Sequence, residues 1–193
     1  MATGLPPDVA QVVLDLAASR PATCGDARVI CVEGPAGSGK TTLASALAEL
    51  TGAPVVHMDD LMEGWDGVDG TGPQLASVLD PLADGRPGSY RQFNWHLDRF
   101  DREVAVPVAP WLILEGVGSG NPGVAERVTV LVWVEADDDL RLSRGLDRDG
   151  SDMEPLWRQF MLDEADVFCA HRTRERADVL VDGTGARPPV LRP

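Results

Sequence analysis

A glycine-rich run near the start of the chain carries residue types that bind phosphate. Gly34 to Thr41 reads GPAGSGKT and matches the pattern GxxxxGK[ST] at every fixed position. Glycines let backbone N–H groups turn toward phosphate oxygens, the Lys40 ammonium reaches the β- and γ-phosphates, and the Thr41 hydroxyl binds Mg²⁺. We therefore expect ATP and Mg²⁺ as cofactors, with nucleotide contacts from Gly34, Ala36, Gly37, Ser38, Gly39, Lys40, Thr41 and Thr42.

Lys40 is the only lysine in the chain, since 16 of the 17 basic residues are arginine. Codon bias in a GC-rich genome accounts for that general preference. Arginine is a planar fork and lysine a compact point charge, so the remaining lysine indicates a position that does not accept arginine. A guanine-reading NKxD motif needs a second lysine, which excludes a GTPase, and the DxxG match at 69–72 is too common to carry weight.

The motif lies where a strand passes into a helix, in a chain whose strands and helices alternate. Apolar β-branched runs predict strands at 28–33, 54–58, 111–115, 128–134 and 179–181. Helical spacing of apolar residues predicts helices at 8–19, 41–50, 73–83, 137–148 and 153–172. Residues 86–108 are mixed and indicate a hairpin or an excursion from the sheet. The alternation predicts a doubly wound α/β fold with five parallel core strands.

Composition and charge limit the function classes. The 193 residues are 44% hydrophobic and 25% charged, as expected of one soluble globular domain. A net charge of −14 argues against nucleic acid or an anionic membrane as partner. No apolar run is long enough to span a membrane, and residues 1–7 lack the pattern of a secretory signal. Three cysteines without CxxC spacing favour a reducing cytoplasm and no disulfide or zinc site; we expect a monomer or small homo-oligomer.

Four ordered segments resemble the uridine kinase-like branch of the small-molecule P-loop kinases. They are GPAGSGKTT at 34–42, HMDD at 57–60, LILEG at 112–116 and RLSRGLDRD at 141–149. The last is similar to a lid helix of pattern RLxRRxxRD, with Gly145 in place of a second arginine, and ADVLVDG at 177–183 resembles the closing strand. The resemblance covers roughly residues 28–183. It implies a single P-loop kinase domain, 1–193, with a small helical lid at roughly 141–152 and an acceptor-binding excursion at roughly 61–108.

Carboxylates end the second and third predicted strands. The resemblance implies that Asp59 is the base, because a carboxylate near the attacking hydroxyl aligns it and takes its proton. Asp60 is the alternative, and both acids could instead cap the following turn. Glu115 stands where a Walker B motif usually has Asp, and it can hold Mg²⁺ with Thr41. An ordinary polar strand end is the other interpretation of Glu115.

Residues 90–99 resemble the family's acceptor-binding YDF segment, with Phe93, Asn94 and Trp95 in register. The aromatic rings would stack on a flat acceptor or wall its pocket, or they form a small core cluster of their own. Phe for Tyr and Asn for Asp remove polar contacts and weaken the case for uridine or cytidine as acceptor. The expected acceptor-binding residues are Asp60, Trp65, Tyr90, Phe93, Trp95, His96 and Arg99.

Arg141, Arg144 and Arg148 are spaced by three and four, so one helix face carries all three. Such a face suits clamping triphosphate oxygens as charge shifts during transfer. We expect Arg141 and Arg144 to act in catalysis with Lys40 and Asp59, and Arg148 to contact the nucleotide. The alternative is that these arginines pair with neighbouring acids on a solvated face, namely Asp137, Asp138, Asp147 and Asp149.

The helix at 153–172 is expected to pack on the core and to carry no site. Its predicted stripe is Leu156, Phe160, Asp163 or Glu164, and Val167. His57 and His171 lack partners at metal-ligand spacing, so both are expected to be structural.

These features predict an ATP- and Mg²⁺-dependent phosphotransferase that moves the γ-phosphate to a hydroxyl of a small molecule, a nucleoside or nucleoside-like acceptor. Two alternatives stay open. One is a nucleotide-binding regulatory ATPase that acts on a protein partner. The other is a nucleoside monophosphate kinase, which needs basic residues such as Arg91 and Arg99 on the acceptor side.

Overall fold

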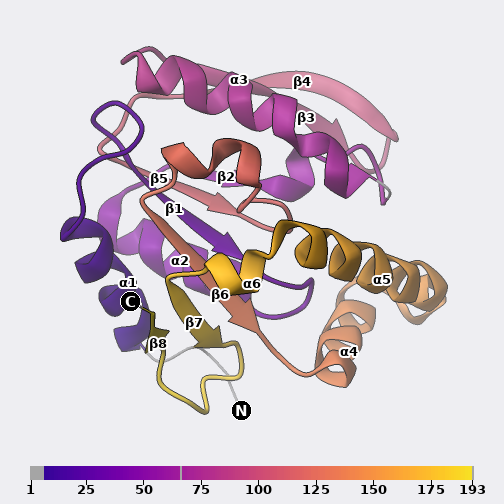
Figure 1. The fold of residues 1–193 in the computed structure, drawn as a ribbon. Helices are drawn as coiled ribbons and strands as arrows, with labels where there is room; N and C mark the ends of the chain where they lie inside the picture. Colours follow the sequence, from indigo (N-terminus) through magenta and orange to yellow (C-terminus); the bar gives the residue numbers. More distant parts are fainter. Residues whose placement is uncertain (1–6, 66, 193) are drawn as a thin grey trace.

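A mostly parallel sheet forms the centre of the computed structural model, which describes residues 7–65 and 67–192 (Figure 1). The strand order is β2-β5-β1-β6-β7-β8. Parallel pairing joins β2 (Val55–His57), β5 (Trp111–Glu115), β1 (Arg28–Glu33), β6 (Val130–Glu135) and β7 (Val179–Asp182). The sheet has one strand more than predicted, because β8 (Val190–Leu191) pairs antiparallel with β7 at the edge. Apart from Pro7, the segment assessed for a secretory signal lies outside the described residues.

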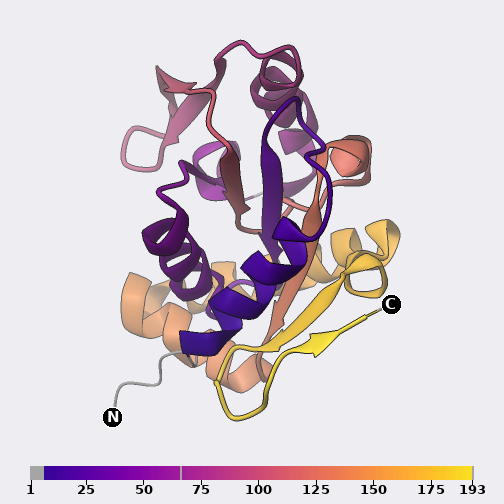
Figure 2. The same ribbon diagram turned by 90° about the vertical axis from the view of Figure 1, so that its left-hand side faces the viewer.

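Helices cover both faces of the sheet, as expected for a doubly wound α/β fold (Figures 1 and 2). The helices are α1 (Pro7–Ala18), α2 (Lys40–Thr51), α3 (Gly72–Ala83), α4 (Asp138–Asp149), α5 (Glu154–His171) and α6 (Thr173–Arg176). Short 3₁₀ turns lie at 58–60, 67–71, 122–127 and 151–153. None of the helices in the described ranges is long and apolar enough to cross a membrane.

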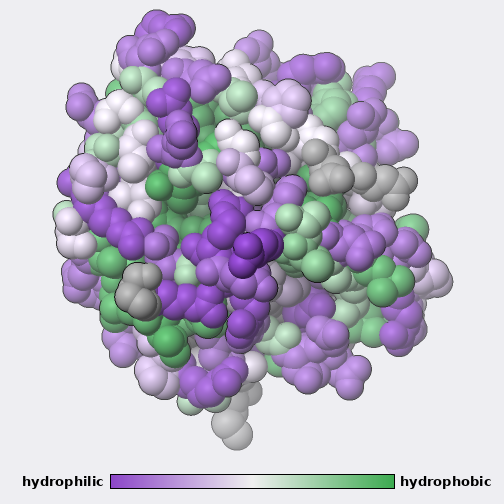
Figure 3. All heavy atoms as spheres, in the orientation of Figure 1, coloured by the Kyte–Doolittle hydropathy of each residue, from purple (hydrophilic) through white to green (hydrophobic). Residues whose placement is uncertain are grey.

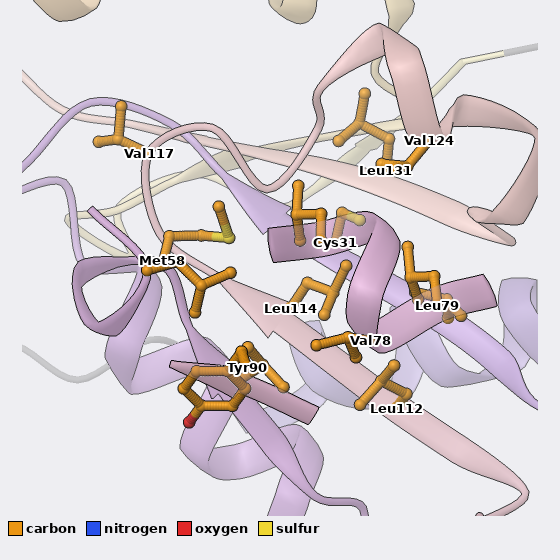
Figure 4. Packing of buried hydrophobic residues seen from close by; sticks show 14 of the residues in the cluster. Cys31, Met58, Val78, Leu79, Tyr90, Leu112, Leu114, Val117, Val124 and Leu131 are labelled. Carbon is orange, nitrogen blue, oxygen red and sulfur yellow. The ribbon is translucent and has the colours of Figure 1, made fainter. Parts of the chain in front are cut away.

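Alternating residues of the central strand supply two separate cores. Ile30 and Val32 of β1 face the cluster formed with α1 and α2. Val29 and Cys31 face the opposite cluster, which includes α3 and part of α5. Figure 4 shows this second cluster, in which Cys31 and Leu114 from the sheet lie beside Val78 and Leu79 of α3. Burial of both strand faces explains the unbroken apolar runs that mark these strands in the sequence.

Residues 86–108 form the hairpin that the sequence left as one of two options. Strands β3 (Gly88–Asn94) and β4 (Arg99–Val106) pair antiparallel in a second sheet, with a bulge between Gln92 and Phe93. The hairpin packs on α3 beyond the β2 edge of the main sheet (Figure 1). The hairpin therefore lies on the side of the molecule where β2 is followed by Asp59 and Asp60.

Helices α4 and α5 project from the opposite side of the phosphate loop, joined by a short turn at 151–153 (Figure 1). The surface in this view is largely hydrophilic, with apolar patches over the region of α4 and α5 (Figure 3). Exposed Leu156 and Leu162 belong to α5. The helix thus buries one face and leaves some apolar surface open.

Candidate functional site

The phosphate loop connects β1 to α2 with the backbone turned inward. Gly34, Gly37 and Gly39 have φ of 139°, 76° and 106°, a region that side chains disfavour. A Cβ on Gly37 would lie 2.6 Å from the carbonyl oxygen of Arg141, so only glycine fits there. Gly39 is the N-cap of α2, and Lys40 is the first helical residue. The positive end of helix α2 therefore lies at the loop.

Polar groups of this loop fit a polyphosphate. The Ser38 hydroxyl is buried and has no hydrogen-bond partner among the described residues. Lys40 is buried, and its Nζ donates to the Pro35 carbonyl oxygen at 2.9 Å, which holds the ammonium across the loop. Thr41 and Thr42 follow on the accessible side of α2. The donors predicted from the motif thus lie together on one short segment.

Glu115 lies between the end of β5 and the phosphate loop. Its Oε1 accepts from the Thr41 hydroxyl at 3.1 Å, and its Oε2 lies 2.7 Å from His57 Nδ1. Burial raises the pKa of Glu115, but the His57 hydrogen bond and the Lys40 charge outweigh it and leave that pKa lowered. Glu115 is therefore ionised, as a metal ligand must be.

His57 has a role that the sequence did not reveal. The pKa of His57 is raised, chiefly by its hydrogen bond to Glu115, and the charges of Asp59 and Asp60 act in the same direction. His57 ends β2, two residues before Asp59, so both project from the same strand end. The available signal was a histidine at the end of a predicted strand, next to two acids in the segment HMDD.

Asp59 lies in the charged cluster at the carboxyl end of the sheet. It sits in the 3₁₀ turn Met58–Asp60 that follows β2. Its surface is open to solvent on one side while protein atoms enclose the rest, and this enclosure raises its pKa. The positive charges of Lys40 and Arg148 oppose that rise. None of the described residues offers a side-chain hydrogen bond to the Asp59 carboxylate.

Asp60 is engaged by the hairpin instead. Its Oδ2 accepts from the Tyr90 hydroxyl at 3.2 Å, and its Oδ1 accepts from Gln92 Nε2 at 2.8 Å. Burial and the Asp60 charge raise the pKa of Tyr90 to about 12, so this hydroxyl stays a donor. Asp60 and Tyr90, both expected to contact an acceptor, are used to anchor β3 to the end of β2.

The other predicted acceptor residues divide into a packed cluster and an exposed turn. Phe93 is buried and makes edge-to-face contacts with Trp95 and Phe100 at 5.3 and 5.2 Å between ring centroids. Trp95 stays 40% exposed, and its indole N–H donates to the Asp59 carbonyl oxygen at 3.1 Å. Trp65 lies against Trp95 at 5.8 Å. The structure thus brings Trp65 and Trp95 to Asp59 and places Phe93 in a small aromatic core.

His96 and Arg99 lie at the turn between β3 and β4 and are exposed. The main-chain N–H of His96 donates to Asn94 Oδ1, which fixes the turn. Asn94 itself donates to Asp101 at 2.6 Å. These side chains therefore stand on the rim of the hairpin, farther along it than Trp95.

The three arginines of α4 make different contacts, and Arg141 is the buried one among them. The Arg141 side chain is 5% exposed and its guanidinium is held by Glu164, Asp138 and the Ala36 carbonyl. These partners engage Nη1 and Nη2 of Arg141, while its buried Nε has no hydrogen-bond partner among the described residues. The acid-pairing alternative describes Arg141 in part, with Asp138 as one of its partners.

Arg144 contacts the phosphate loop, and Arg148 pairs with an acid as the alternative interpretation describes. Arg144 donates to the carbonyl oxygens of Gly37 at 3.0 Å and Gly183 at 3.4 Å, and so ties the phosphate loop to the segment after β7. Arg148 binds Asp149 through two hydrogen bonds. The pKa of Arg148 is raised chiefly by this hydrogen bonding, and the charges of Asp59 and Glu115 contribute to the rise.

Glu164 of α5 contacts the phosphate loop, although α5 was expected only to pack. Its Oε2 accepts from the Ala36 N–H at 2.8 Å and its Oε1 from Arg141 at 2.7 Å. Ala36 was expected to bind nucleotide, but its N–H is directed to Glu164. The buried stripe of α5 is Trp157, Phe160, Glu164 and Phe168. Phe160 and Glu164 belong to the predicted stripe, whereas Trp157 and Phe168 are buried in place of Leu156 and Val167.

No family model matches the chain. One similar solved structure is that of a possible uridine kinase from Bacillus stearothermophilus, with 19% identity, a TM-score of 0.62, and 90% of this chain and 95% of that chain covered. Another is that of a candidate fructose transport system kinase from a Silicibacter species, with 20% identity, a TM-score of 0.62, and 94% and 98% covered. The chain has the P-loop kinase fold of these proteins. The resemblance seen in the sequence is thereby confirmed at the level of the fold.

A curated protein is similar to a shorter part of the chain. It is the ATP-dependent Clp protease ATP-binding subunit ClpX 3 of Methylococcus capsulatus, 29% identical over 122 residues. The match covers 63% of this chain and 27% of that protein, so the chain spans about a quarter of the length of this relative. The name of this relative describes it as an ATP-binding subunit.

Two hollows lie away from the charged centre. One, of about 800 Å³, opens between α3 and the hairpin, where Gln74, Arg91 and Phe100 line it. The other, of about 780 Å³, lies between α4 and α5. Neither is lined by Lys40 or Asp59, although Tyr90 lines the first and Pro35 of the phosphate loop lines the second.

Proposed function

We propose that this protein is a kinase that transfers the γ-phosphate of ATP, with Mg²⁺, to a hydroxyl group of a small molecule. One observation carries the proposal: the accessible carboxylate of Asp59 shares a charged cluster with Lys40 and Glu115. A carboxylate beside a phosphate loop can align and deprotonate a hydroxyl. A protein that only switches between nucleotide-bound states does not need such a carboxylate.

The nucleotide side would work through the loop and the two strand ends. Amides of residues 37–41 and the α2 N-terminus bind the β- and γ-phosphates, and Lys40 stabilises the charge that shifts onto them. Thr41 and Glu115 would hold Mg²⁺, with His57 keeping Glu115 oriented. When bound, Mg²⁺ neutralises charge on the phosphate oxygens. Arg144 keeps the loop in place from α4.

The acceptor side would place the hydroxyl at Asp59 and a flat group near Trp95. Asp59 accepts the proton of the attacking hydroxyl as the phosphoryl group is transferred. The exposed Trp95 ring lies beside Asp59 and suits a nucleoside or nucleoside-like acceptor. We propose residues 61–108 as the acceptor-binding part and residues 141–152 as a lid within a single domain.

The contacts of the arginines argue against a nucleoside monophosphate as acceptor. The Arg91 guanidinium lies 5.2 Å from the Phe100 ring centroid and donates to the Phe100 carbonyl oxygen. Arg102 hydrogen-bonds Gln92. The hairpin engages Arg91 and Arg102. Of the two predicted residues, Arg91 and Arg99, an acceptor phosphate would therefore depend on Arg99.

A screen with γ-labelled ATP tests the proposal. The purified protein is incubated with Mg²⁺, labelled ATP and separate panels of nucleosides, sugars and vitamin alcohols, and organic phosphates are resolved from inorganic phosphate. The kinase proposal expects label in an organic product in at least one panel. ATP turnover that no alcohol changes, and that a protein partner stimulates, would favour the regulatory ATPase instead.

A further inference from the structure

Helix α5 places a tryptophan directly under the arginine-bearing helix. Trp157 is 1% exposed and packs against Gly145 of α4. A Cβ on Gly145 would lie 2.4 Å from the indole carbons Cε2 and Cζ2, closer than any real contact. Gly145 stands where the resembling lid-helix pattern has a second arginine. It carries no side chain, and the Trp157 indole fills the space.

The indole holds the last arginine of α4 through a carboxylate. Trp157 Nε1 donates to Asp149 Oδ2 at 2.9 Å. Asp149 in turn accepts from Arg148 Nε and Nη2 at 2.8 and 2.9 Å, and the Arg148 guanidinium carbon lies 5.6 Å from the Trp157 ring centroid. A bidentate carboxylate and an aromatic face restrict the guanidinium to few orientations.

Arg148 held in this way lies on the side of α4 that meets the phosphate loop. It is one helical turn beyond Arg144, which donates to the Gly37 carbonyl oxygen of the loop at 3.0 Å. The pKa of Arg148 is raised first by the hydrogen bond to Asp149, and the charges of Asp59 and Glu115 add to that rise. The arginine is thus on the helix face from which a phosphoryl group bound at the loop could be contacted.

Aromatic contacts continue from Trp157 to the acceptor side. The Trp65 ring packs edge-to-face on Trp157 and on Trp95, at 6.2 and 5.8 Å between ring centroids. Trp95 is hydrogen-bonded to the main chain of Asp59. A continuous row of three tryptophans, Trp95, Trp65 and Trp157, therefore joins the base to the residue that holds Arg148.

We propose that Trp157 is a positioning residue that fixes Asp149 and thereby directs Arg148 at the γ-phosphate. The row of three tryptophans ties this arrangement to the acceptor-binding hairpin. The inference rests on the proposed function, because it assigns Arg148 to the phosphoryl group that is transferred. It concerns a residue, Trp157, for which the P-loop motif itself provides no role.

Nucleotide affinity without any acceptor provides the test. Trp157→Phe removes the indole donor and its second ring but keeps an aromatic side chain in the core. We expect the affinity for Mg²⁺ and AMP-PNP to fall about tenfold while the affinity for Mg²⁺ and ADP is unchanged, because only the γ-phosphate faces Arg148. Asp149→Asn, which leaves the tryptophan in place, should give the same selective loss.

Trp133→Phe is the matched control. Trp133 is also buried and also donates an indole N–H to a carboxylate at 2.9 Å, but its partner is Glu135 on β6. Its nucleotide affinities should equal those of the wild type. Gly145→Ala should reproduce the loss of AMP-PNP affinity by displacing the indole, even though alanine is the better helix former. Combined with Trp157→Phe, it should cause no further loss.

An equal loss of ADP and AMP-PNP affinity, or a loss shared by Trp133→Phe, would make Trp157 merely structural and overturn the inference. Unchanged AMP-PNP affinity in folded Asp149→Asn would also overturn it, and this variant decides the question if Trp157→Phe does not fold. The failure of every alcohol to accept phosphate would refute the kinase proposal instead. The two failures are distinguishable because the affinities are measured without an acceptor.

Discussion

The nucleotide side and the acceptor side of the site are built in different ways. On the nucleotide side the donors come from a single run, 34–41, whose backbone is set by glycines. On the acceptor side the polar groups come from distant segments and bind one another, as Asp60 does with Tyr90 and Gln92. The first is a local structure with groups left for a ligand, and the second is a packed frame that leaves Asp59 and part of Trp95 open.

This difference predicts separable effects of substitution. A change on the nucleotide side should affect the chemistry with little cost to the fold, because the loop glycines and helix α2 remain. A change in the packed frame should lower both the activity and the stability, because each polar group there is the hydrogen-bond partner of another. The following variants test that division, beginning with the largest expected effect.

Lys40→Ala should lower phosphoryl transfer by about 10⁴-fold, the scale of a cation that stabilises charge in this reaction. The melting temperature should stay close to that of the wild type, since alanine suits the first turn of α2. Lys40→Arg should also lose most activity, because a planar fork does not replace a point charge across the loop. Normal turnover by Lys40→Ala would remove the kinase proposal.

Asp59→Asn and Asp60→Asn sharpen the comparison within two adjacent residues. Asp59→Asn should lower kcat by about 10³-fold with little change in the KM for ATP. Asp60→Asn should instead lower the free energy of unfolding by about 1–3 kcal/mol, because one of the donors on Tyr90 and Gln92 loses its acceptor. Steady-state kinetics and urea unfolding measure both. If Asp60→Asn lowers kcat and Asp59→Asn does not, the base is Asp60.

The pH dependence of the reaction rate tests the pKa of Asp59 in the same kinetic experiment. Enclosure raises the pKa of Asp59, so the wild-type rate should rise with pH through a pKa above that of an ordinary aspartate. Asp59→Asn should remove this limb from the profile. A wild-type acid limb at the ordinary value would contradict the enclosed position.

Glu164→Ala should show that the buried contact between α5 and the loop carries stability. Removing one partner of a buried ion pair costs about 3–5 kcal/mol, because Arg141 is left buried without it. Glu154→Ala is the control on the same helix: its pair with Arg158, also at 2.7 Å, is exposed and should contribute less than about 1 kcal/mol. Equal losses in urea unfolding would contradict the assignment.

Glu33 should give an effect on stability that depends on pH. It accepts from Gly34, Gly118 and Gly120, and burial raises its pKa to about 7 from 4.5. The folded state thus binds more protons than the unfolded state between these values. The stability from Glu33 is present below pH 4.5 and is lost, by about 3 kcal/mol, as pH rises through 7. Glu33→Gln should abolish this slope relative to the wild type in urea unfolding; an unchanged slope would contradict it.

The central strands and the phosphate loop could be predicted because their information is local. Strands β1 and β5 have the predicted bounds, since β-branched runs end at turn residues. The hairpin stayed ambiguous because β4 is mostly exposed and shows no clean alternation. Strand β8 has only two residues and exists by pairing with β7.

The side chains that connect distant segments could not be predicted in the same way. Arg141 appeared to be free for phosphate, and only the fold shows that Glu164 buries it. A signal was present, since Glu164 interrupts the stripe of Trp157, Phe160 and Phe168, and a charged residue in an apolar stripe calls for a buried partner. Which arginine supplies that partner depends on tertiary packing.

Transfer of label from γ-labelled ATP to an organic acceptor tests the central claim most directly. Each panel that gives an organic phosphate with the wild type is repeated with Asp59→Asn and Lys40→Ala. The kinase account predicts a labelled organic product with the wild type, strongly reduced by both substitutions. Label recovered only as inorganic phosphate in every panel, at a rate that Asp59→Asn leaves unchanged, would contradict it.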